Sequence, residues 1–460
     1  MRDSHDNIRR KMLQRGLSHR VTESFLANVD LVGQESGYVS LGSVGVPDPT
    51  LLLDYSTVMG NATRDHSDAR RLLSRAALIK LNGGRSTTMG GTVPKGILKA
   101  KRGLSYLEVV VNQIKAIKER WDCHVPLILM NSFYTDQPTK ELIKDLDCDV
   151  RTFVQNEVPR LVEETLVPLD TGTEEDWVPP GHGDVYRSLL SSGMLDQLRS
   201  AGYKWAFISN IDNLAATMDP IVLGLIEAQG ADFLLEVTPR TEADRKGGAL
   251  VVKNGQLELL EIAQVHPEER PEFMDIHRFP VFNTNNIWVD LDALADLLAG
   301  GSLNLPLIQN RKCIYGTNVL QLETAMGSAI GCFPRAKGLK VSRGRFCPTK
   351  DIGDLFAVRS DACLLDGMAH LVRNPKRPMD LPFLPTVQFG DDFLDSPQRI
   401  NERFEDPASV SLLHAEVFKV FGNVFFERDV TIQGNVEIAV PPGQKYTVPK
   451  GAVLANRRYP

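Results

Sequence analysis

The chain has 460 residues, 42% of them hydrophobic and 24% charged, which is the composition of a globular protein with two or three domains. A net charge of -6 argues against a general binder of nucleic acids or membrane surfaces. The six cysteines form no C-x-x-C pair, which indicates free thiols rather than a zinc site or a disulfide framework. The charged amino terminus lacks the apolar core of a signal sequence, and no apolar run has the length of a membrane span. We therefore expect a cytoplasmic protein.

The chain divides into three predicted segments. Residues 1–74 carry apolar side chains at helical spacing and predict a helical amino-terminal segment. In residues 75–375, short apolar runs alternate with amphipathic helices, which predicts a largely parallel α/β sheet with helices on both faces. Ligands of such sheets bind at the carboxyl ends of the strands, so we expect the chemistry in the loops that follow residues 81, 131, 155 and 210.

The clearest predicted helix covers residues 105–120. Its apolar residues share one face, and Ser105 and Glu108 have the spacing of a capping box. Farther along, Asn254-Gly255 lies between two apolar runs and predicts a β-hairpin.

The carboxyl-terminal residues 376–460 are predicted to form a separate β domain. A proline-rich stretch over residues 374–397 is typical of a linker. After it, short alternating runs separated by glycine predict a small β-solenoid or β-roll.

A glycine-rich loop follows the apolar run that ends at Leu81. Its glycines let backbone N–H groups approach a phosphate, and Lys95 supplies a positive charge. It is not a Walker loop, because Met89 occupies the position of the second glycine, and Arg85 breaks the dinucleotide-binding pattern. Taken alone, the loop fits phosphate binding and a plain tight turn equally well.

Two further loops carry candidate residues. His182 lies between two glycines just before a predicted helix, where it could donate to a ligand or fill a turn, and Asp184 could cap that helix. Asp212 follows an apolar strand, where a carboxylate is placed to hold Mg²⁺ against phosphates or to cap a helix.

Together these segments resemble the eukaryote-type UDP-glucose pyrophosphorylases. Seven motifs occur in the order found in that family, and any one of them alone would be a weak signal. They are LNGG (81–84) with Pro94-Lys95, PPGHGD (179–184), SNIDNL (209–214), KGG (246–248), LLEIAQV (259–265), FNTNN (282–286) and QLETAMG (321–327).

The resemblance implies a doubly wound, GT-A-like (Rossmann-like) nucleotidyltransferase domain followed by a left-handed β-helix. It implies that a sugar 1-phosphate, with Mg²⁺ as cofactor, attacks the α-phosphate of a nucleoside triphosphate and releases pyrophosphate. UTP and glucose 1-phosphate are the expected substrates. The tail of such proteins could support homo-oligomers, and neither nucleic acid nor membrane is an expected partner.

The motif match also implies residue roles. The nucleotide is assigned to Asn82, Gly83, Gly84, Gln155, Gly181, His182 and Asn210. The hexose is assigned to Gly248, Glu261 and Asn286, and the metal to Asp212. Lys95 and Lys350 match the family lysines that neutralise the reacting phosphates.

The phosphate-side loop departs from the family. Arg85 and Ser86 replace leucine and glycine, and Thr92 replaces a lysine. A β carbon at position 86 limits how closely the chain approaches a triphosphate. The departures leave open UTP use with a variant loop, another base such as GTP, a cyclitol 1-phosphate as substrate, or a catalytically weak homologue.

Two hypotheses come from other classes. A glycosyltransferase would need an Asp-x-Asp motif, but the pairs 290/292 and 145/147 fit helix caps or helix surfaces better. The altered loop also admits a non-catalytic binding protein. Release of pyrophosphate from sugar 1-phosphate and nucleoside triphosphate separates the three.

Overall fold

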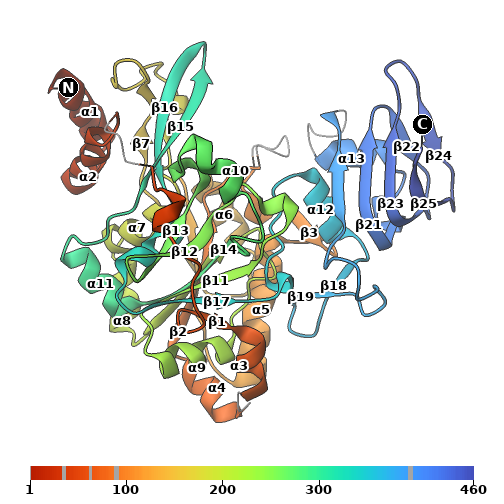
Figure 1. Cartoon of the computed structure of the whole chain (residues 1–460), viewed down its shortest axis with the longest axis horizontal. Coiled ribbons are helices and arrows are strands. Elements are labelled where there is room, and N and C mark those ends of the chain that lie inside the picture. The colour runs from red at the N-terminus through yellow and green to blue at the C-terminus, as the bar shows by residue number, and fades with distance from the viewer. Residues whose placement is uncertain (1, 34–37, 62–64, 87–92, 392–396, 460) are drawn as a thin grey trace.

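The computed structural model describes residues 2–33, 38–61, 65–86, 93–391 and 397–459 (Figure 1). Its centre is an eight-stranded sheet in which β14 runs antiparallel to both neighbours and every other pair is parallel. The order is β1 (Leu52–Asp54), β17 (Ala336–Lys340), β11 (Phe233–Pro239), β14 (Val281–Asp290), β10 (Trp205–Asn210), β2 (Ala76–Asn82), β5 (Leu127–Asn131) and β6 (Val150–Val154).

Both faces of this sheet are buried. Successive residues of a strand point to opposite faces, and residues that point to either face belong to a hydrophobic core. Leu78 of β2 belongs to one core cluster and its neighbour Ile79 to the other. The first face packs against α4 (His66–Leu73), α5 (Tyr106–Trp121), α9 (Pro220–Gln229) and α12 (Ile352–Arg359). The second packs against α7 (Val185–Ser191), α8 (Met194–Ser200) and α11 (Leu291–Ala299). The predicted largely parallel sheet between two helix layers is confirmed.

The local predictions rest on short-range chemistry, and they are confirmed. Ser105 and Glu108 form the capping box that begins α5. Asn254 and Gly255, both with positive φ, join β12 (Ala249–Lys253) to β13 (Gln256–Leu260). Asp290 caps α11, and all six cysteines are free.

The amino-terminal segment is helical but also supplies a strand. It contains α1 (Arg2–Gln14), α2 (His19–Asp30), α3 (Tyr55–Asn61) and α4. Its residues 52–54 form β1 and extend the edge of the central sheet beside β17, which corrects the expectation of helices and a connection alone. In Figure 1, α1 and α2 lie at the opposite end of the molecule from the carboxyl-terminal strands.

The carboxyl-terminal strands form parallel pairs. β20 (Thr386–Phe389), β21 (Ser411–Phe421), β23 (Thr431–Ala439) and β25 (Val453–Tyr459) make one sheet. A second contains β22 (Val424–Phe426) and β24 (Tyr446–Val448), and α13 (Pro397–Arg403) lies alongside. Phe356 of α12 packs against Phe389 and Phe404, so the core continues from the central sheet into the tail.

The proline-rich stretch is not a plain linker, which corrects that prediction. It contains β20, and its Arg377 is only 1% exposed. The Arg377 guanidinium donates to the carbonyls of Leu412, Leu413 and Ala415, which need buried donors.

Short elements complete the fold. The hairpin of β15 (Leu307–Ile314) and β16 (Thr317–Thr324) pairs with β8 (Leu161–Val162). Further pairs are β3 (Lys99–Lys101) with β4 (Leu104–Ser105), β7 (Val158–Pro159) with β9 (Trp177–Val178) and β18 (Cys363–Leu365) with β19 (Leu371–Arg373). The remaining helices are α6 (Asp136–Ile143) and α10 (Arg270–Phe273). Within the described ranges, no helix combines the length and apolarity that crossing a bilayer requires.

Candidate functional site

The predicted loops meet at one edge of the central sheet. β2, β5 and β10 are parallel neighbours, and their register pairs Asn82 with Asn131 and Leu81 with Asn210. Because the three strands end at the same level, the residues that follow them lie together. This is the edge at which the fold class binds ligands.

Lys95 and Asp212 meet at this edge. The Lys95 ammonium lies 2.8 Å from Oδ2 of Asp212 and donates to the carbonyl of Thr349 at 2.9 Å. Tyr106, on α5, donates to the hydroxyl of Thr349 and fixes that residue. The structure thus joins the glycine-rich loop, the loop after β10 and the segment before α12 at one point.

Lys350 follows Thr349 directly. Its backbone N–H donates to Asp354 at 2.8 Å, and Asp351 caps α12 through Asp354. Burial and the nearby Asp351 carboxylate raise the pKa of Asp354 to about 6. Lys350 is exposed, and the carbonyl that accepts from Lys95 belongs to the residue just before it.

One oxygen of Asp212 remains available for a ligand. Oδ1 is buried and has no hydrogen-bond partner, whereas Oδ2 binds Lys95. The described part of the chain has no group of three or more His, Cys, Asp or Glu side chains arranged for a metal. Magnesium commonly takes one or two protein carboxylates and completes its shell with phosphate and water oxygens. The donor set therefore fits Mg²⁺ bound jointly by Asp212 and a phosphate.

Asn82 holds the glycine-rich loop in place. Its amide donates to Asn131 and Thr139, and its Oδ1 accepts from the backbone of Gly96 at 3.2 Å. The side chain is 1% exposed, so its amide is committed within the protein. The resemblance implies a nucleotide contact through the backbone at this position, and that contact stays a prediction.

Gln155 and Gly83 come from different loops and pack together. A β carbon on Gly83 would lie 2.2 Å from Nε2 of Gln155, so a larger residue here would displace the Gln155 amide. The glycine at this position therefore lets the Gln155 amide lie directly against the loop.

His182 lies in the short 3-10 turn directly before α7. Its Nδ1 accepts from the backbone of Met326 at 3.0 Å, and burial lowers its pKa to about 4, so the ring is neutral at physiological pH. Gly181 has a φ of 83°, and a β carbon there would lie 2.5 Å from the Thr324 carbonyl.

Asp184 does not cap α7 with its side chain, which corrects one of the two sequence readings. Its carboxylate accepts from the backbone N–H of Asn156 at 2.8 Å and from the hydroxyl of Ser188. Since Asn156 adjoins Gln155, this bond ties the His182 loop to the Gln155 loop. Asn156 and Asp184 are 28 residues apart in the chain, so no local sequence pattern indicates this bond.

Two of the three predicted hexose residues lie together. A β carbon on Gly248 would lie 2.5 Å from Oε1 of Glu261, and burial raises the pKa of that carboxyl group. The Gly248 carbonyl accepts from the backbone of Asn283, whose amide lies against Gly327. Glycines here leave space beside a carboxylate and an amide, which are the partners that sugar hydroxyls need.

Asn286 is placed differently from the other hexose residues. It is 0% exposed, and its amide donates to Glu236 and to the carbonyl of Arg345 while its oxygen accepts from Asn213. All its polar atoms have protein partners, so this side chain orders the strand beneath the site. Direct contact with a hexose stays a prediction.

A buried ion pair supports that strand, and sequence reasoning missed it. Arg345 donates to both oxygens of Glu236, at 2.7 and 2.9 Å, and Trp288 donates to the same carboxylate. The Arg345 side chain also lies 3.7 Å from Asp219. The partners are 109 residues apart, so no sequence spacing indicates the pair.

Lys80 is a second buried cation that sequence reasoning missed. It is 0% exposed and donates to Ser209 and to the Ala216 carbonyl, which brackets the loop that carries Asp212. Burial lowers its pKa to about 7. The signal in the sequence that could have revealed this buried cation was a lysine within an apolar strand.

Two residues of the glycine-rich loop that differ from the family pattern have partners within the protein. The Arg85 guanidinium lies 3.8 Å from the Tyr134 ring centroid and 3.8 Å from Glu175. Ser86 is 0% exposed and donates to the Val93 carbonyl at 2.9 Å. Thr92 lies outside the described residues.

The comparisons with known proteins agree with this geometry. The family model described as UTP--glucose-1-phosphate uridylyltransferase matches residues 23–433. The chain is 38% identical over 439 residues to UTP--glucose-1-phosphate uridylyltransferase of Solanum tuberosum, covering 93% of this chain and 91% of that protein. The Saccharomyces cerevisiae enzyme of the same name is 39% identical over 394 residues, covering 84% and 78%.

Solved structures agree as well. A UDP-glucose phosphorylase from Trypanosoma brucei superposes with a TM-score of 0.87 and 34% identity, over 99% of both chains. A Leishmania major UDP-glucose pyrophosphorylase variant in complex with UDP-glucose gives 0.86 and 31%, over 99% of both chains. This chain therefore belongs to the UTP–glucose-1-phosphate uridylyltransferase family, whose members are nucleotidyltransferases.

Proposed function

We propose that this protein forms UDP-glucose and pyrophosphate from UTP and glucose 1-phosphate. The observation that carries the proposal is the convergence of Lys95, Asp212 and the Thr349-Lys350 segment at the carboxyl edge of the sheet. Two positive side chains and a carboxylate with a free oxygen suit a site where two phosphates must meet. The relatives of Solanum tuberosum and Saccharomyces cerevisiae carry this activity in their names.

The reaction needs alignment and charge neutralisation rather than a protein nucleophile. An oxygen of the sugar phosphate attacks the α-phosphorus of UTP, the bond from that phosphorus to the β-bridging oxygen breaks, and pyrophosphate leaves. Lys95 and Lys350 offset the repulsion between the two anions and stabilise charge in the transition state. Mg²⁺, held by Asp212, would supply a further positive charge at the phosphates.

The other site residues fix the two substrates. The backbone of Asn82, Gly83 and Gly84 would follow the triphosphate, with Gln155 at the base edge. Gly181 and His182 would line the base and ribose, and Asn210 would lie between nucleotide and sugar. Gly248 and Glu261 would bind the hexose, with Asn286 ordering the strand below.

Several finer features belong to the same proposal. The central part would be a doubly wound GT-A-like domain over residues 75–375, preceded by the segment 1–74. The tail, residues 376–460, would be a left-handed β-helix; its parallel strands with in-register Ser411, Thr431 and Val453 support a solenoid. We further propose a cytoplasmic protein that can form homo-oligomers through the tail.

An activity matrix tests the function. Purified protein with Mg²⁺ is supplied with each nucleoside triphosphate and each of glucose, galactose, mannose and cyclitol 1-phosphates, and pyrophosphate is measured. We expect release with UTP and glucose 1-phosphate at a kcat of at least about 1 s⁻¹. No release with any pair, or release only with another base, would overturn the assignment.

A further inference from the structure

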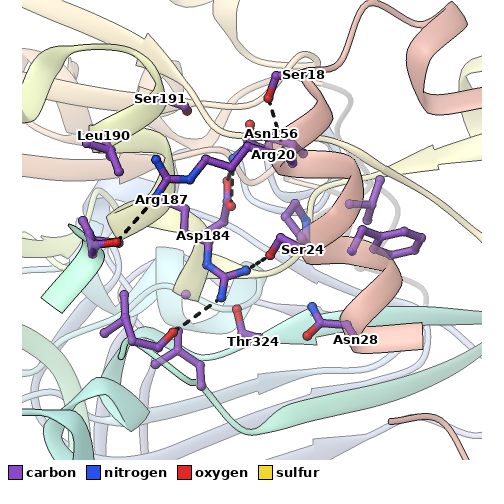
Figure 2. A pocket seen from close by; sticks show the side chains of 18 of the residues that line it. Ser18, Arg20, Ser24, Asn28, Asn156, Asp184, Arg187, Leu190, Ser191 and Thr324 are labelled. Carbon is purple, nitrogen blue, oxygen red and sulfur yellow. Dashed lines mark hydrogen bonds between the residues drawn. The ribbon is translucent and has the colours of Figure 1, made fainter. Parts of the chain in front are cut away.

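A cavity of about 400 Å³ lies away from the Lys95–Asp212 site, between the amino-terminal helix α2 and the central domain (Figure 2). The second helix layer forms its far wall, through α7 and the end of α11. Its volume lies within the range of small-molecule sites. The residues assigned to substrates do not line it, so the proposed reaction leaves it unused.

Two arginines cross this cavity from opposite sides. Arg20 extends from α2 to the carbonyl of Leu298 at 3.4 Å. Arg187 extends from α7 to the hydroxyl of Ser24 and to the carbonyl of Leu303, the latter at 3.4 Å (Figure 2). Among the described residues neither guanidinium forms a salt bridge within 4.0 Å, and the hydrogen bonds of both go to neutral acceptors, while the charge of Arg187 also acts on the Asp184 carboxylate.

The one acidic side chain in the wall is already engaged. Asp184 accepts from Asn156 and Ser188, and both its oxygens have donors. Two guanidinium groups against one carboxylate leave the described lining with a net positive charge. An anion with a planar head can bind a guanidinium through two parallel hydrogen bonds.

The rest of the lining is largely apolar. It includes Val21, Phe25, Val158, Leu190, Leu298 and Leu305. Such a wall suits a hydrocarbon or aromatic body, and hydroxyl and amide groups such as Asn28 and Thr324 lie among the apolar side chains. The two features together define an amphipathic ligand.

The wall is also the back of the proposed nucleotide site. Gly183 and Asp184 line the cavity, while the preceding His182, which the resemblance assigns to the nucleotide, accepts from the backbone N–H of Met326. A β carbon on Gly183 would lie 2.5 Å from Thr324 and 2.9 Å from Leu305, so this loop is wedged between two lining residues. A rearrangement of Thr324 or Leu305 would therefore press on the residue that follows His182.

We propose that this cavity is a regulatory site for a small organic anion. The acidic head, a carboxylate, phosphate or sulfonate, binds Arg20 and Arg187, and the apolar body lies against the leucine-rich wall. Occupancy changes the affinity for the nucleotide through the loop 181–184. The binding site stands on the cavity alone, whereas the coupling rests on the proposed function.

Fluorescence titration with 8-anilinonaphthalene-1-sulfonate tests the binding site, because this probe joins a sulfonate to an aromatic body. We expect saturable binding by the full chain, and a Kd at least about tenfold weaker in Arg187→Met, which removes the charged donor. Arg187→Lys keeps the charge and should weaken binding less. Arg199→Met removes a guanidinium outside the cavity and should bind like wild type.

A second variant tests the site independently, in case Arg187→Met loses binding because it misfolds. Ser191 is exposed at the cavity wall, and Ser191→Trp fills space without removing either arginine. It should also lose binding while its circular dichroism stays unchanged. Equal binding by wild type, Arg187→Met and Ser191→Trp would overturn the site.

Calorimetric titration with UTP, without sugar phosphate, tests the coupling. We expect the UTP Kd to change at least about threefold when the probe is saturating, and the probe Kd to change by the same factor with UTP, since coupling is reciprocal. An unchanged UTP Kd with the probe bound would refute regulation. Absence of UTP binding in any condition would refute the proposed function instead, and would leave the fluorescence result standing.

Discussion

The ammonium of Lys95 lies 2.8 Å from Oδ2 of Asp212, although 117 residues separate them in the chain. The contact leaves Oδ1 of Asp212 buried without a hydrogen-bond partner. A buried oxygen of this kind costs free energy unless a ligand satisfies it. This pair is the centre of the proposed site, and several consequences can be measured.

Asp212→Asn should abolish metal-dependent turnover and leave the fold intact. The amide keeps the size of the side chain but removes the charge that would hold Mg²⁺ and that pairs with Lys95. Pyrophosphate release is measured against Mg²⁺ concentration, with circular dichroism as the check on folding. Activation by Mg²⁺ equal to that of wild type would contradict the metal assignment.

Lys350→Met should lower kcat by roughly 10²-fold or more, because a charge aimed at the transition state is lost. KM for both substrates should change less than kcat. The matched control is Lys376→Met, an exposed lysine after β19 that has no role in the proposed site. If Lys350→Met keeps the kcat of wild type, as Lys376→Met should, Lys350 takes no part in transfer.

Gly248→Ala should raise KM for glucose 1-phosphate. The new methyl group would lie 2.5 Å from Oε1 of Glu261 and would displace that carboxylate. KM for UTP should stay near its wild-type value. Gly367→Ala is the control, since no atom lies within 4 Å of a β carbon there. A rise confined to the KM for UTP would count against the hexose assignment.

Ser86→Gly should change the KM for UTP rather than selectivity for the sugar. The substitution removes the β carbon and the hydroxyl that donates to Val93, so the loop can approach the triphosphate more closely. Steady-state kinetics with both substrates varied decides this. An effect confined to the KM for glucose 1-phosphate would count against a role of Ser86 in binding the triphosphate.

The neutral His182 predicts that stability depends on pH. Burial lowers its pKa from 6.5 to about 4. Between pH 4 and pH 6.5, the imidazole is therefore protonated in the unfolded chain and neutral in the folded chain. The contribution of the neutral imidazole to the free energy of unfolding is fully present above pH 6.5 and falls as the pH drops toward 4. At pH 5 the loss is about 2 kcal/mol.

Thermal unfolding midpoints of wild type and His182→Gln at pH 7 and pH 5 measure this effect. The wild-type midpoint should fall more on acidification than that of the variant, which has no group to titrate. Parallel shifts in the two proteins would show that His182 is not held neutral by the fold.

The sequence predicted what depends on short-range chemistry. The period of apolar residues located α5, the Ser105–Glu108 spacing located its start, and Asn254-Gly255 located a hairpin. The order of motifs placed Lys95 and Asp212 in one site before any distance was known. The helix, its start and the hairpin are read within a few residues, whereas the shared site of Lys95 and Asp212, which are 117 residues apart, came from the family resemblance.

What the sequence did not show depends on long-range pairing. No local pattern indicates that β14 runs antiparallel in the middle of the sheet, or that residues 52–54 add a strand at its edge. The proline-rich stretch resembled a linker because the carbonyls that bind Arg377 come from β21 and are distant in sequence. The committed amide of Asn286 likewise follows from partners in three other segments.

The most direct test of the account is a crystal structure of the complex with UDP-glucose and Mg²⁺. We predict the diphosphate within hydrogen-bond distance of Lys95 and Lys350, the metal on Oδ1 of Asp212, and the uracil against Gln155. A nucleotide bound elsewhere, or a metal that does not touch Asp212, would contradict the proposed site.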